Sequence, residues 1–414
     1  MFYKNKKKCR LCSGSLSNIL NLGKQPLANN FSSQKKIKTY PLNLTICKNC
    51  HLLQLKEAFN TNFLFKNYAY YTPSRSNFLK HYKIILKRIS KFKVINSNTK
   101  VLEIGCNNGD FLDYIKFERN CLVVGVDPAK NLAEYCNSKS IKIFSSSFNS
   151  RLANLIKKKY ESFDVIILRH VYAHIDNIKD INIGLKKISN SNTIIYIENA
   201  YAYETLMKNE FDQIYHEHMS YIHLRPMVTF FKNYNLEIFD SFISPLHGGS
   251  ICMLISKYKN FKPTTQLNKI LNHEKKNFNK KLILKFLKNV QINKNKFINL
   301  IKNLKKKSYI IGTYGASAKG STLLNFYKIN KKYIYKAFDN SENKINKYLP
   351  GSQIKITNSD SIEKYKCNYI IVTAWNYLKI IIKKELHYLK KGGKFIIPIP
   401  KPRIISIKNY KKFL

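Results

Sequence analysis

The sequence is short of several residue types, and each shortage excludes a class of protein. Its 414 residues include only 14 Gly and 11 Pro, too few for a collagenous or linker-rich chain, and its 44% hydrophobic content excludes a disordered one. No apolar run approaches the ~18 residues that a membrane-spanning helix requires. The basic start MFYKNKKKCR is not followed by the apolar segment of a secretory signal. We therefore expect a globular, cytoplasmic protein of two or three domains.

Acidic residues are scarce too, with 24 Asp and Glu against 73 Lys and Arg and a formal net charge of +49. Such a charge would ordinarily indicate nucleic-acid binding. The excess is almost entirely Lys, however, and it accompanies heavy use of Asn, Ile and Tyr along the whole chain. We interpret it as the composition that an AT-rich genome imposes on any protein. The charge would still favour a small anionic substrate.

The pattern of apolar residues predicts an α/β protein with an additional small domain. Residues 1–74 contain paired cysteines and short β-like runs. Residues 75–264 alternate strands (KVLEIG, CLVVGVD, FDVIILRH, TIIYIEN) with helices, which indicates a parallel sheet covered by helices. Residues 265–307 are Lys-rich and predict a helical connector, and residues 308–414 resume the alternation with SYIIGTYG. We expect a small metal-binding domain, a central Rossmann-like domain and a C-terminal Rossmann-like domain.

Two Cys-x-x-Cys pairs, Cys9 with Cys12 and Cys47 with Cys50, predict the metal site. This spacing places two thiolates on one turn, and two such turns supply the tetrahedral S₄ set that Zn²⁺ prefers. Four thiolates leave no open position, so the zinc would be structural. The alternative is that one pair is coincidental or redox-active. The remaining cysteines stand singly in apolar runs, as core residues do.

A glycine-containing turn follows the first strand of the central domain. The predicted cofactor-binding residues there are Glu103, Gly105, Asn107 and Gly109, and Asp127 ends the next strand. Glycines let the backbone approach a ligand, and an acidic residue at that strand end can accept hydrogen bonds from ribose hydroxyls. The alternative is an ordinary strand-turn-helix with a surface Asp. The pattern resembles that of class I S-adenosylmethionine methyltransferases, which implies an adenine contact at Phe148 and a fourth strand that ends at His170 beside the methyl donor.

The segment from Asp212 to Tyr221 concentrates acid-base side chains, namely Tyr215, His216, Glu217 and His218. The histidines are two residues apart, so they would share one face of a strand but not of a helix; in a turn all four side chains could converge. His174, after the presumed fourth strand, is expected at the same rim. A single His is more often a core or surface residue, but this density favours proton abstraction.

Taken together, these motifs make the chain similar to the sugar C-methyltransferase family from end to end. The shared motifs, besides the cysteine pairs, are Gly23–Phe31, Tyr68–Tyr70, Glu103–Asn107, Val126–Asn131, Ala173–Ile175, Ile214–His218, His247–Ser250, Tyr314–Gly320, Leu349–Gly351 and Ala374–Asn376.

The resemblance implies S-adenosylmethionine and structural zinc as cofactors. It implies methylation, through an enolate, of the carbon next to the ketone of a dTDP-linked 4-keto-deoxysugar. His218 would be the base, assisted by Tyr215, Glu217, His174 and His216. The substrate-binding residues would be Tyr70, Tyr221, Gly248, Gly249, Ser250, Tyr314 and Lys319. We expect a monomer that binds neither membrane nor nucleic acid.

Two residues depart from the family pattern. His51 follows Cys50 where the family usually has Gly, which could alter the second zinc knuckle. Asn108 stands where Asp is common, which could weaken a contact in the donor loop. The rival hypotheses are a nucleic-acid methyltransferase and a non-catalytic zinc-ribbon protein. The first lacks the D/N-P-P-Y element and the Pro-Cys pair, and the second leaves the donor loop and the His-Glu-His cluster unexplained.

Overall fold

The computed structural model describes residues 3–34, 37–65 and 75–414. Contacts divide the chain into two compact units that are not consecutive segments. Unit 1 comprises Met1–Ser17, Thr45–Tyr203 and Met219–Phe278, and unit 2 comprises Asn18–Leu44, Glu204–His218 and Asn279–Leu414. The Tyr215–His218 segment therefore belongs to the same unit as the C-terminal domain, whereas His174 belongs to unit 1.

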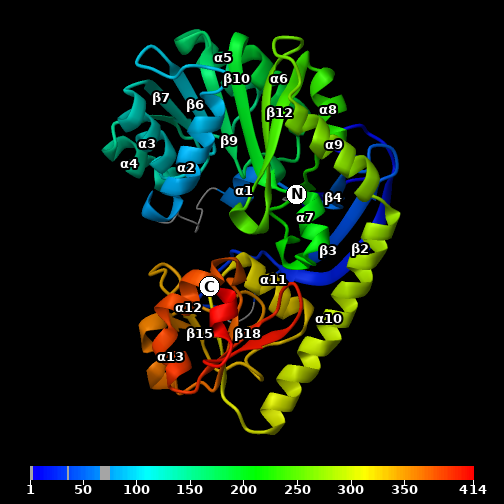
Figure 1. Ribbon diagram of the computed structural model, residues 1–414, viewed down its shortest axis with the longest axis vertical. Coiled ribbons are helices and arrows are strands. Elements are labelled where there is room, and N and C mark those ends of the chain that lie inside the picture. Colours follow the sequence, from blue (N-terminus) through cyan, green and yellow to red (C-terminus); the bar gives the residue numbers. More distant parts are fainter. Residues whose placement is uncertain (1–2, 35–36, 66–74) are drawn as a thin grey trace. The chain divides into compact units, whose positions relative to one another are not determined.

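Unit 1 is built on a seven-stranded sheet in the order β12-β13-β10-β9-β6-β7-β8 (Figure 1). The bounds are β6 Lys100–Ile104, β7 Leu122–Val126, β8 Lys142–Phe144, β9 Phe163–Arg169, β10 Ser189–Ala200, β12 Leu236–Ser244 and β13 Ser250–Lys257. β8, β7, β6, β9 and β10 pair in parallel, and β13 pairs antiparallel with β10 and β12. The strand order reverses at β6 and β9, which is where open α/β sheets bind their ligands.

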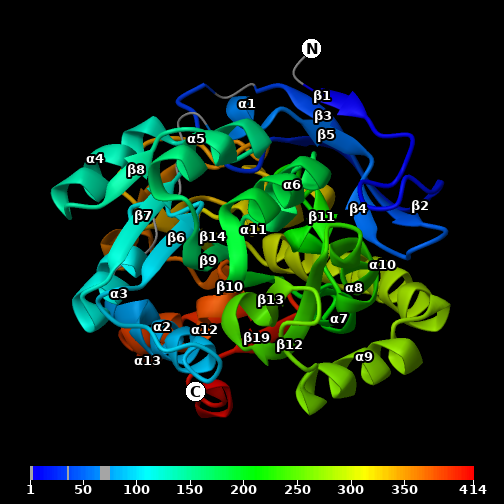
Figure 2. The same ribbon diagram turned by 90° about the horizontal axis from the view of Figure 1, so that it is seen from above.

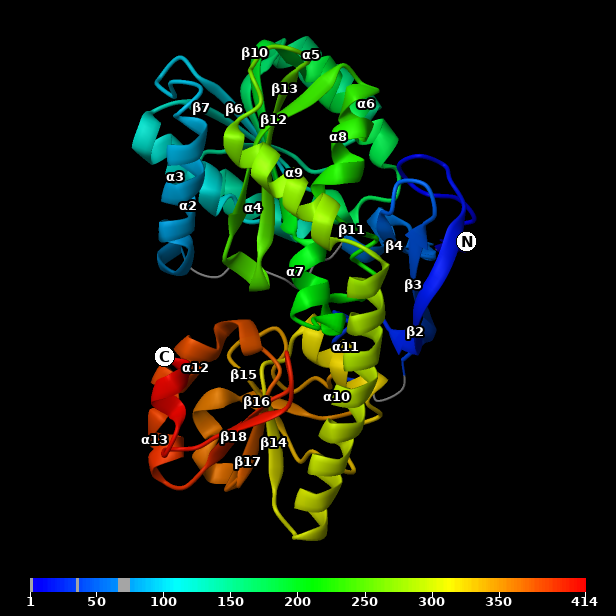
Figure 3. The ribbon, with the colours of Figure 1, turned by 45° about the vertical axis from the view of Figure 1, so that its right-hand side comes forward.

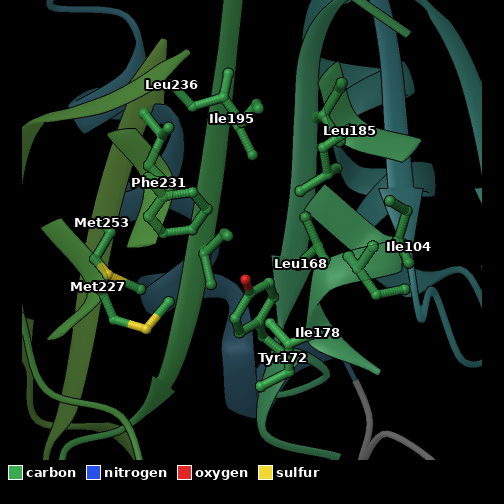
Figure 4. Close-up of a cluster of buried hydrophobic side chains, with 14 of the residues drawn as sticks. Ile104, Leu168, Tyr172, Ile178, Leu185, Ile195, Met227, Phe231, Leu236 and Met253 are labelled. Atoms are coloured by element: carbon green, nitrogen blue, oxygen red, sulfur yellow. The ribbon is translucent and has the colours of Figure 1, made fainter. Parts of the chain in front are cut away.

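Alternate residues of these strands face the two helical layers. Leu102 and Ile104 lie in the same buried cluster as residues of α5, α6 and α8, while Val101 lies with residues of α2 and α3. Figure 2 shows α5 and α6 apart from α2 and α3, and Figure 4 shows the first cluster around Phe231 and Tyr172. The helices of the unit are α1 Thr61–Phe65, α2 Arg75–Ile89, α3 Asp110–Arg119, α4 Lys130–Ser138, α5 Ser150–Tyr160, α6 Ile178–Ile188, α8 Leu224–Lys232 and α9 Thr265–Asn277.

Unit 2 contains a six-stranded sheet in the order β16-β15-β14-β17-β18-β19, parallel except for β19. The bounds are β14 Ile311–Tyr314, β15 Ala337–Asp339, β16 Ile356–Asn358, β17 Tyr369–Val372, β18 Lys394–Ile397 and β19 Arg403–Ile405. One face is covered by α12 Leu378–Lys384 and α13 Leu386–Lys390, and α10 Lys280–Lys306 and α11 Ala318–Phe326 lie on the other side (Figure 3). The predicted α/β fold class, with two Rossmann-like sheets and a four-cysteine cluster, is confirmed.

Short strands form the remaining sheets. β1 Tyr3–Asn5 pairs with β5 Glu57–Phe59, and β11 Ser220–Tyr221, β4 Leu53–Leu55, β3 Thr39–Cys47 and β2 Leu16–Pro26 form a four-stranded sheet in that order. A short helix, α7 Ala202–Met207, and the 3₁₀ turn η2 Phe211–Gln213 precede the Tyr215–His218 segment. Among the described residues, no helix combines the length and apolarity needed to cross a bilayer.

The Lys-rich stretch contains α9 and α10. The apolar residues Leu282, Phe286, Val290, Phe297, Ile301 and Leu304 of α10 are buried at intervals of one or two helical turns, while its lysines are largely exposed. This spacing produces one apolar stripe, so the helix packs on one side despite its charge.

The start of α10 rests on a cap that can be tested. The Asn279 side chain accepts a hydrogen bond from the Leu282 amide at 3.1 Å. We expect Asn279→Ala to lower the free energy of unfolding by about 1 kcal/mol, because it leaves that amide without its cap. Denaturant unfolding checks this, with Asn303→Ala on the exposed side of α10 as the control that should lose nothing. Equal stability of the two variants would contradict the assignment of the cap.

Candidate functional site

The four cysteines of the predicted zinc site lie together in unit 1. Their sulfur atoms are all within 4.8 Å of one another. Cys9 Sγ lies 3.6 Å from Cys50 Sγ, and Cys12 Sγ lies 3.4 Å from Cys47 Sγ. The Cys50 thiol holds the pKa of Cys9 below its ordinary value by hydrogen bonding. Thiolates at these separations match the edges of a tetrahedron around Zn²⁺, so the donor set fits a closed structural site.

The second knuckle explains why glycine is usual after its last cysteine. His51 has φ of +62°, in the left-handed region that glycine enters without strain. Its amide donates to the Cys47 carbonyl at 3.1 Å, which closes the turn. With His51 in place of the usual Gly, the knuckle keeps its shape but its backbone is strained. The four sulfur atoms stay in place.

The predicted donor loop connects β6 to α3 at the reversal of strand order. Gly105, Asn107 and Gly109 have φ of +73°, +51° and +74°. A Cβ atom at Gly105 would collide with the Val171 side chain, and the positive φ also favours glycine at this position. Asp127, at the end of β7, accepts the Asn107 and Ala129 amides at 2.9 Å each. These bonds fix the loop beside a carboxylate, and burial raises the pKa of Asp127.

Glu103 occupies the end of β6, beneath that loop. Its Oε1 accepts from Arg169 at 2.7 and 2.8 Å, whereas its buried Oε2 has no hydrogen-bond partner among the described residues. Burial raises the pKa of Glu103 to about 7, although Arg169 opposes the shift. Phe148 is buried against Gly184. The glycine loop and the two carboxylates suit the amino and hydroxyl groups of a charged nucleoside.

A group of histidines around Glu198 was missed by the sequence prediction, apart from His170. Glu198, at the end of β10, lies 2.8 Å from His81 Nε2 and 3.7 Å from His170 Nε2. Burial alone would raise the pKa of Glu198, but the two imidazoles bring it below its ordinary value. Glu198 ends the apolar run TIIYIE at the carboxyl end of a parallel strand, which is the edge where such sheets bind ligands. This position is the sequence feature that could have indicated its role.

His170 also contacts the predicted substrate loop. The rings of His170 and His247 meet edge to face at 4.5 Å, and both residues have φ of +55°. Gly248 and Gly249 have positive φ too, and the Ser250 hydroxyl donates to the Leu246 carbonyl. The loop at 247–250 therefore lies at the end of β9, beside the predicted donor site. Strained backbone of this kind concentrates at functional sites.

Two other predicted residues, His174 and Tyr221, belong to unit 1. The His174 ring packs edge to face on Phe65 at 5.4 Å. Tyr221 is buried in β11. Tyr70 lies outside the described residues.

The Tyr215–His218 segment forms a tight turn in unit 2, and its hydrogen bonds define the state of His218. His218 Nδ1 lies 2.8 Å from the Gln213 carbonyl oxygen. Because a carbonyl only accepts, Nδ1 must carry the proton, and the neutral ring then has Nε2 as its basic nitrogen. The Tyr215 hydroxyl lies 2.8 Å from that Nε2 and can donate to it. The result is an imidazole with its basic nitrogen next to a phenol.

The other two side chains of the segment point elsewhere. Asn29 Nδ2 donates to both carboxylate oxygens of Glu217 at 2.8 Å. His216 is buried, with Nε2 3.0 Å from the Pro41 carbonyl oxygen and its ring edge to face with Tyr40. Burial lowers the pKa of His216 to about 4, so this ring stays neutral near pH 7. It braces the turn, whereas His218 presents a base.

The lowered pKa of His216 predicts a pH dependence of stability. Between its ordinary pKa of 6.5 and about 4, the unfolded chain binds more protons at His216 than the folded chain does. This residue therefore contributes a loss of stability as pH falls through that window, on the order of 3 kcal/mol in total. Glu103 and Glu210, each with a pKa raised to about 7, act in the opposite direction.

The comparison of wild type with His216→Gln isolates the contribution of His216. We expect the stability difference between the two proteins to shrink as pH is lowered from 7 to 4, measured by denaturant unfolding. A difference that stays constant over this range would show that His216 does not titrate as the burial predicts.

The remaining predicted substrate residues lie in the C-terminal sheet of unit 2. The Tyr314 hydroxyl donates to Glu385 Oε1 at 3.0 Å inside the unit. Lys319 Nζ lies over the Trp375 ring, 4.5 Å from its centroid.

Comparison with known proteins assigns a separate domain to each of three parts of the chain. Three family models match consecutive parts of the chain: a zinc binding domain over residues 9–65, a methyltransferase domain over 77–241 and a C-methyltransferase C-terminal domain over 245–400. C-methyltransferase NovU of Streptomyces niveus is 27% identical over 409 residues, which cover 97% of each chain.

Among solved structures, magnesium protoporphyrin IX methyltransferase of Synechocystis PCC 6803 with bound SAM is 12% identical, covering 44% of this chain and 81% of that one, with a TM-score of 0.33. N-methyltransferase NodS of Bradyrhizobium japonicum is 12% identical, covering 45% of this chain and 100% of that one, with a TM-score of 0.34.

The donor loop, the sheet order and the matched domain together define a class I S-adenosylmethionine-dependent methyltransferase with a structural zinc site. The C-terminal match and the full-length relative are both described as C-methyltransferases, the class that the sequence motifs resemble.

Proposed function

We propose that this C-methyltransferase methylates the carbon next to the ketone of a dTDP-linked 4-keto-deoxysugar through an enolate intermediate. The observation that carries the proposal is the state of His218, with Nδ1–H donating to the Gln213 carbonyl and basic Nε2 beside the Tyr215 hydroxyl. Carbon is a poor nucleophile until it loses a proton, so a C-methyltransferase needs such a base. A ketone makes the adjacent C–H acidic enough for imidazole to remove it.

In this proposal His218 Nε2 takes the α-proton, and the Gln213 carbonyl stabilises the resulting imidazolium by accepting the hydrogen bond from Nδ1. The Tyr215 hydroxyl then donates to the developing enolate oxygen, where a fixed donor lowers the barrier most. When bound, S-adenosylmethionine supplies an electrophilic methyl group. The enolate carbon would form the new bond to that methyl as the sulfonium–methyl bond breaks, and S-adenosylhomocysteine would leave as the neutral thioether. The proton stays on His218 until solvent removes it.

The other named residues support these two. The hydrogen bonds from Asn29 hold Glu217, and we propose that this carboxylate and His174 orient the sugar. The loop at 247–250 and Tyr221 would bind the substrate, as would Tyr70 and Tyr314. The basic composition suits a nucleotide diphosphate, and the family resemblance supports the dTDP-keto-sugar. We expect the protein to act as a cytoplasmic monomer.

The test is methyl transfer from labelled S-adenosylmethionine to a panel of nucleotide-linked sugars. The panel contains dTDP-4-keto-deoxysugars, their reduced 4-hydroxy counterparts, the UDP equivalents, and DNA and RNA. We expect label in the keto-sugars and none in the 4-hydroxy sugars, because these have no acidic α-carbon. Transfer to nucleic acid, or to the 4-hydroxy sugars equally, would overturn the proposal.

A further inference from the structure

The strand order of the C-terminal sheet reverses between β14 and β17. Open parallel sheets bind ligands outside the carboxyl ends of such strands. The turn after β14 contains Gly315, with φ of +93°, and leads into α11. The turn after β17 leads into a 3₁₀ turn that begins at Trp375. A side chain at Gly315 would collide with Ala374, so the two turns touch.

A segment of the chain itself lies against the turn that follows β17. The Trp375 indole Nε1 donates to Asp212 Oδ2 at 2.6 Å. The ring of Phe211, next to Asp212, packs on Phe326 and Tyr327 with ring centroids 5.3 and 5.2 Å apart. Asp212 is fully buried. The 3₁₀ turn η2 is therefore held by a hydrogen bond from Trp375 and by ring contacts with Phe326 and Tyr327 at the end of α11.

The electrostatics of this contact depend on Lys319. Its Nζ is buried over Trp375 and has no hydrogen-bond partner within residues 3–34, 37–65 and 75–414. Burial raises the pKa of both Asp212 and Glu210, and the ammonium of Lys319 opposes the shift in each. Without Lys319, two buried carboxyl groups would lose their counter-charge, which is costly in a low-dielectric interior.

Asp212, which Trp375 holds, is adjacent to Gln213, which orients His218. Asp212 is followed by Gln213, whose carbonyl accepts from His218 Nδ1 and so fixes its tautomer and ring direction. We propose that Asp212, Trp375 and Lys319 are positioning residues that anchor this turn at the carboxyl-end edge of the C-terminal sheet and thereby aim His218 at the substrate. The inference rests on the proposed role of His218 as the base.

Trp375 is the only tryptophan in the sequence, so its fluorescence reports this contact alone. The variants are Asp212→Asn and Lys319→Met, with Trp375→Phe as a substitution that keeps an aromatic ring. Lys336→Met is the matched control, because Lys336 also lies over an aromatic ring of unit 2, 5.4 Å from the Tyr365 centroid, and this ring has no part in the contact. Two readouts need no substrate: the tryptophan emission of the variants that retain Trp375, and amide hydrogen exchange in the peptide that spans 210–218.

We expect both Asp212→Asn and Lys319→Met to shift the emission, and all three variants to speed exchange in that peptide relative to the control. With a keto-sugar substrate, kcat should fall about 10- to 100-fold, the usual loss for a misplaced group, while KM for S-adenosylmethionine changes little. Wild-type exchange and emission in the variants would overturn the inference. So would saturable quenching of Trp375 by dTDP that Lys319→Met abolishes, since this edge of the sheet would then be a nucleotide site. Because the spectroscopic readouts are independent of turnover, failure of the proposed function alone would leave them intact.

Discussion

The His218→Asn variant is expected to lose both proton abstraction and methyl transfer. Asparagine can still donate to the Gln213 carbonyl, but it has no basic nitrogen, so the turn is kept and the base is lost. Removal of a general base typically lowers the rate about 10²- to 10⁴-fold. The measurement is deuterium incorporation at the α-carbon of a keto-sugar in D₂O, alongside methyl transfer.

The matched control is His387→Asn, a half-exposed histidine of the same unit that pairs with Glu363. It should retain both activities. Tyr215→Phe should lower transfer less than His218→Asn does, because it removes only the donor to Nε2 and to the enolate oxygen. If His218→Asn exchanges deuterium at the wild-type rate, another residue is the base, and His170 beside Glu198 becomes the first to test.

Loss of zinc is expected to unfold the cysteine-rich part of unit 1. The metal links two knuckles that are 35 residues apart, between Cys12 and Cys47, and the strands around them are short. Apparent binding free energies of structural zinc are roughly 10–16 kcal/mol, far more than such a segment gains from apolar burial. We therefore expect Cys47→Ala to lose its bound zinc and its protection from proteolysis over residues 9–17 and 45–65.

The control for this prediction is Cys121→Ala, which removes a buried thiol outside the cluster. It should retain zinc by elemental analysis and a wild-type pattern of proteolysis. Retention of stoichiometric zinc in Cys47→Ala, or intact folding after exhaustive chelation, would show that the four sulfur atoms do not form a structural metal site.

Much of the architecture could be predicted from local patterns. The Cys-x-x-Cys spacing indicated the four-sulfur cluster, because a knuckle needs only residues adjacent in sequence. The runs KVLEIG and CLVVGVD indicated parallel strands, and Gly105 and Gly109 indicated a turn, which the structure has with positive φ at both. These features depend on period and composition within a few residues.

The internal arrangement of the site depends on contacts between distant residues, which no local pattern reveals. Asn29 and Glu217 are 188 positions apart, and Asp212 and Trp375 are 163 apart. The density of the Tyr-His-Glu-His segment predicted acid-base chemistry. It could not tell which imidazole is buried and which has a basic Nε2, because the Pro41 and Gln213 carbonyls make that distinction.

The central claim is that a carbon-carbon bond forms next to a ketone, and isotope coupling tests it most directly. The enzyme is incubated with S-adenosylmethionine that has a ¹³C methyl group and with a dTDP-4-keto-deoxysugar that is ¹³C-labelled at the α-carbon. We predict a methyl signal with one-bond ¹³C–¹³C coupling to that carbon. A labelled methyl group without such coupling, at the shift of an O-methyl or N-methyl group, would contradict the account.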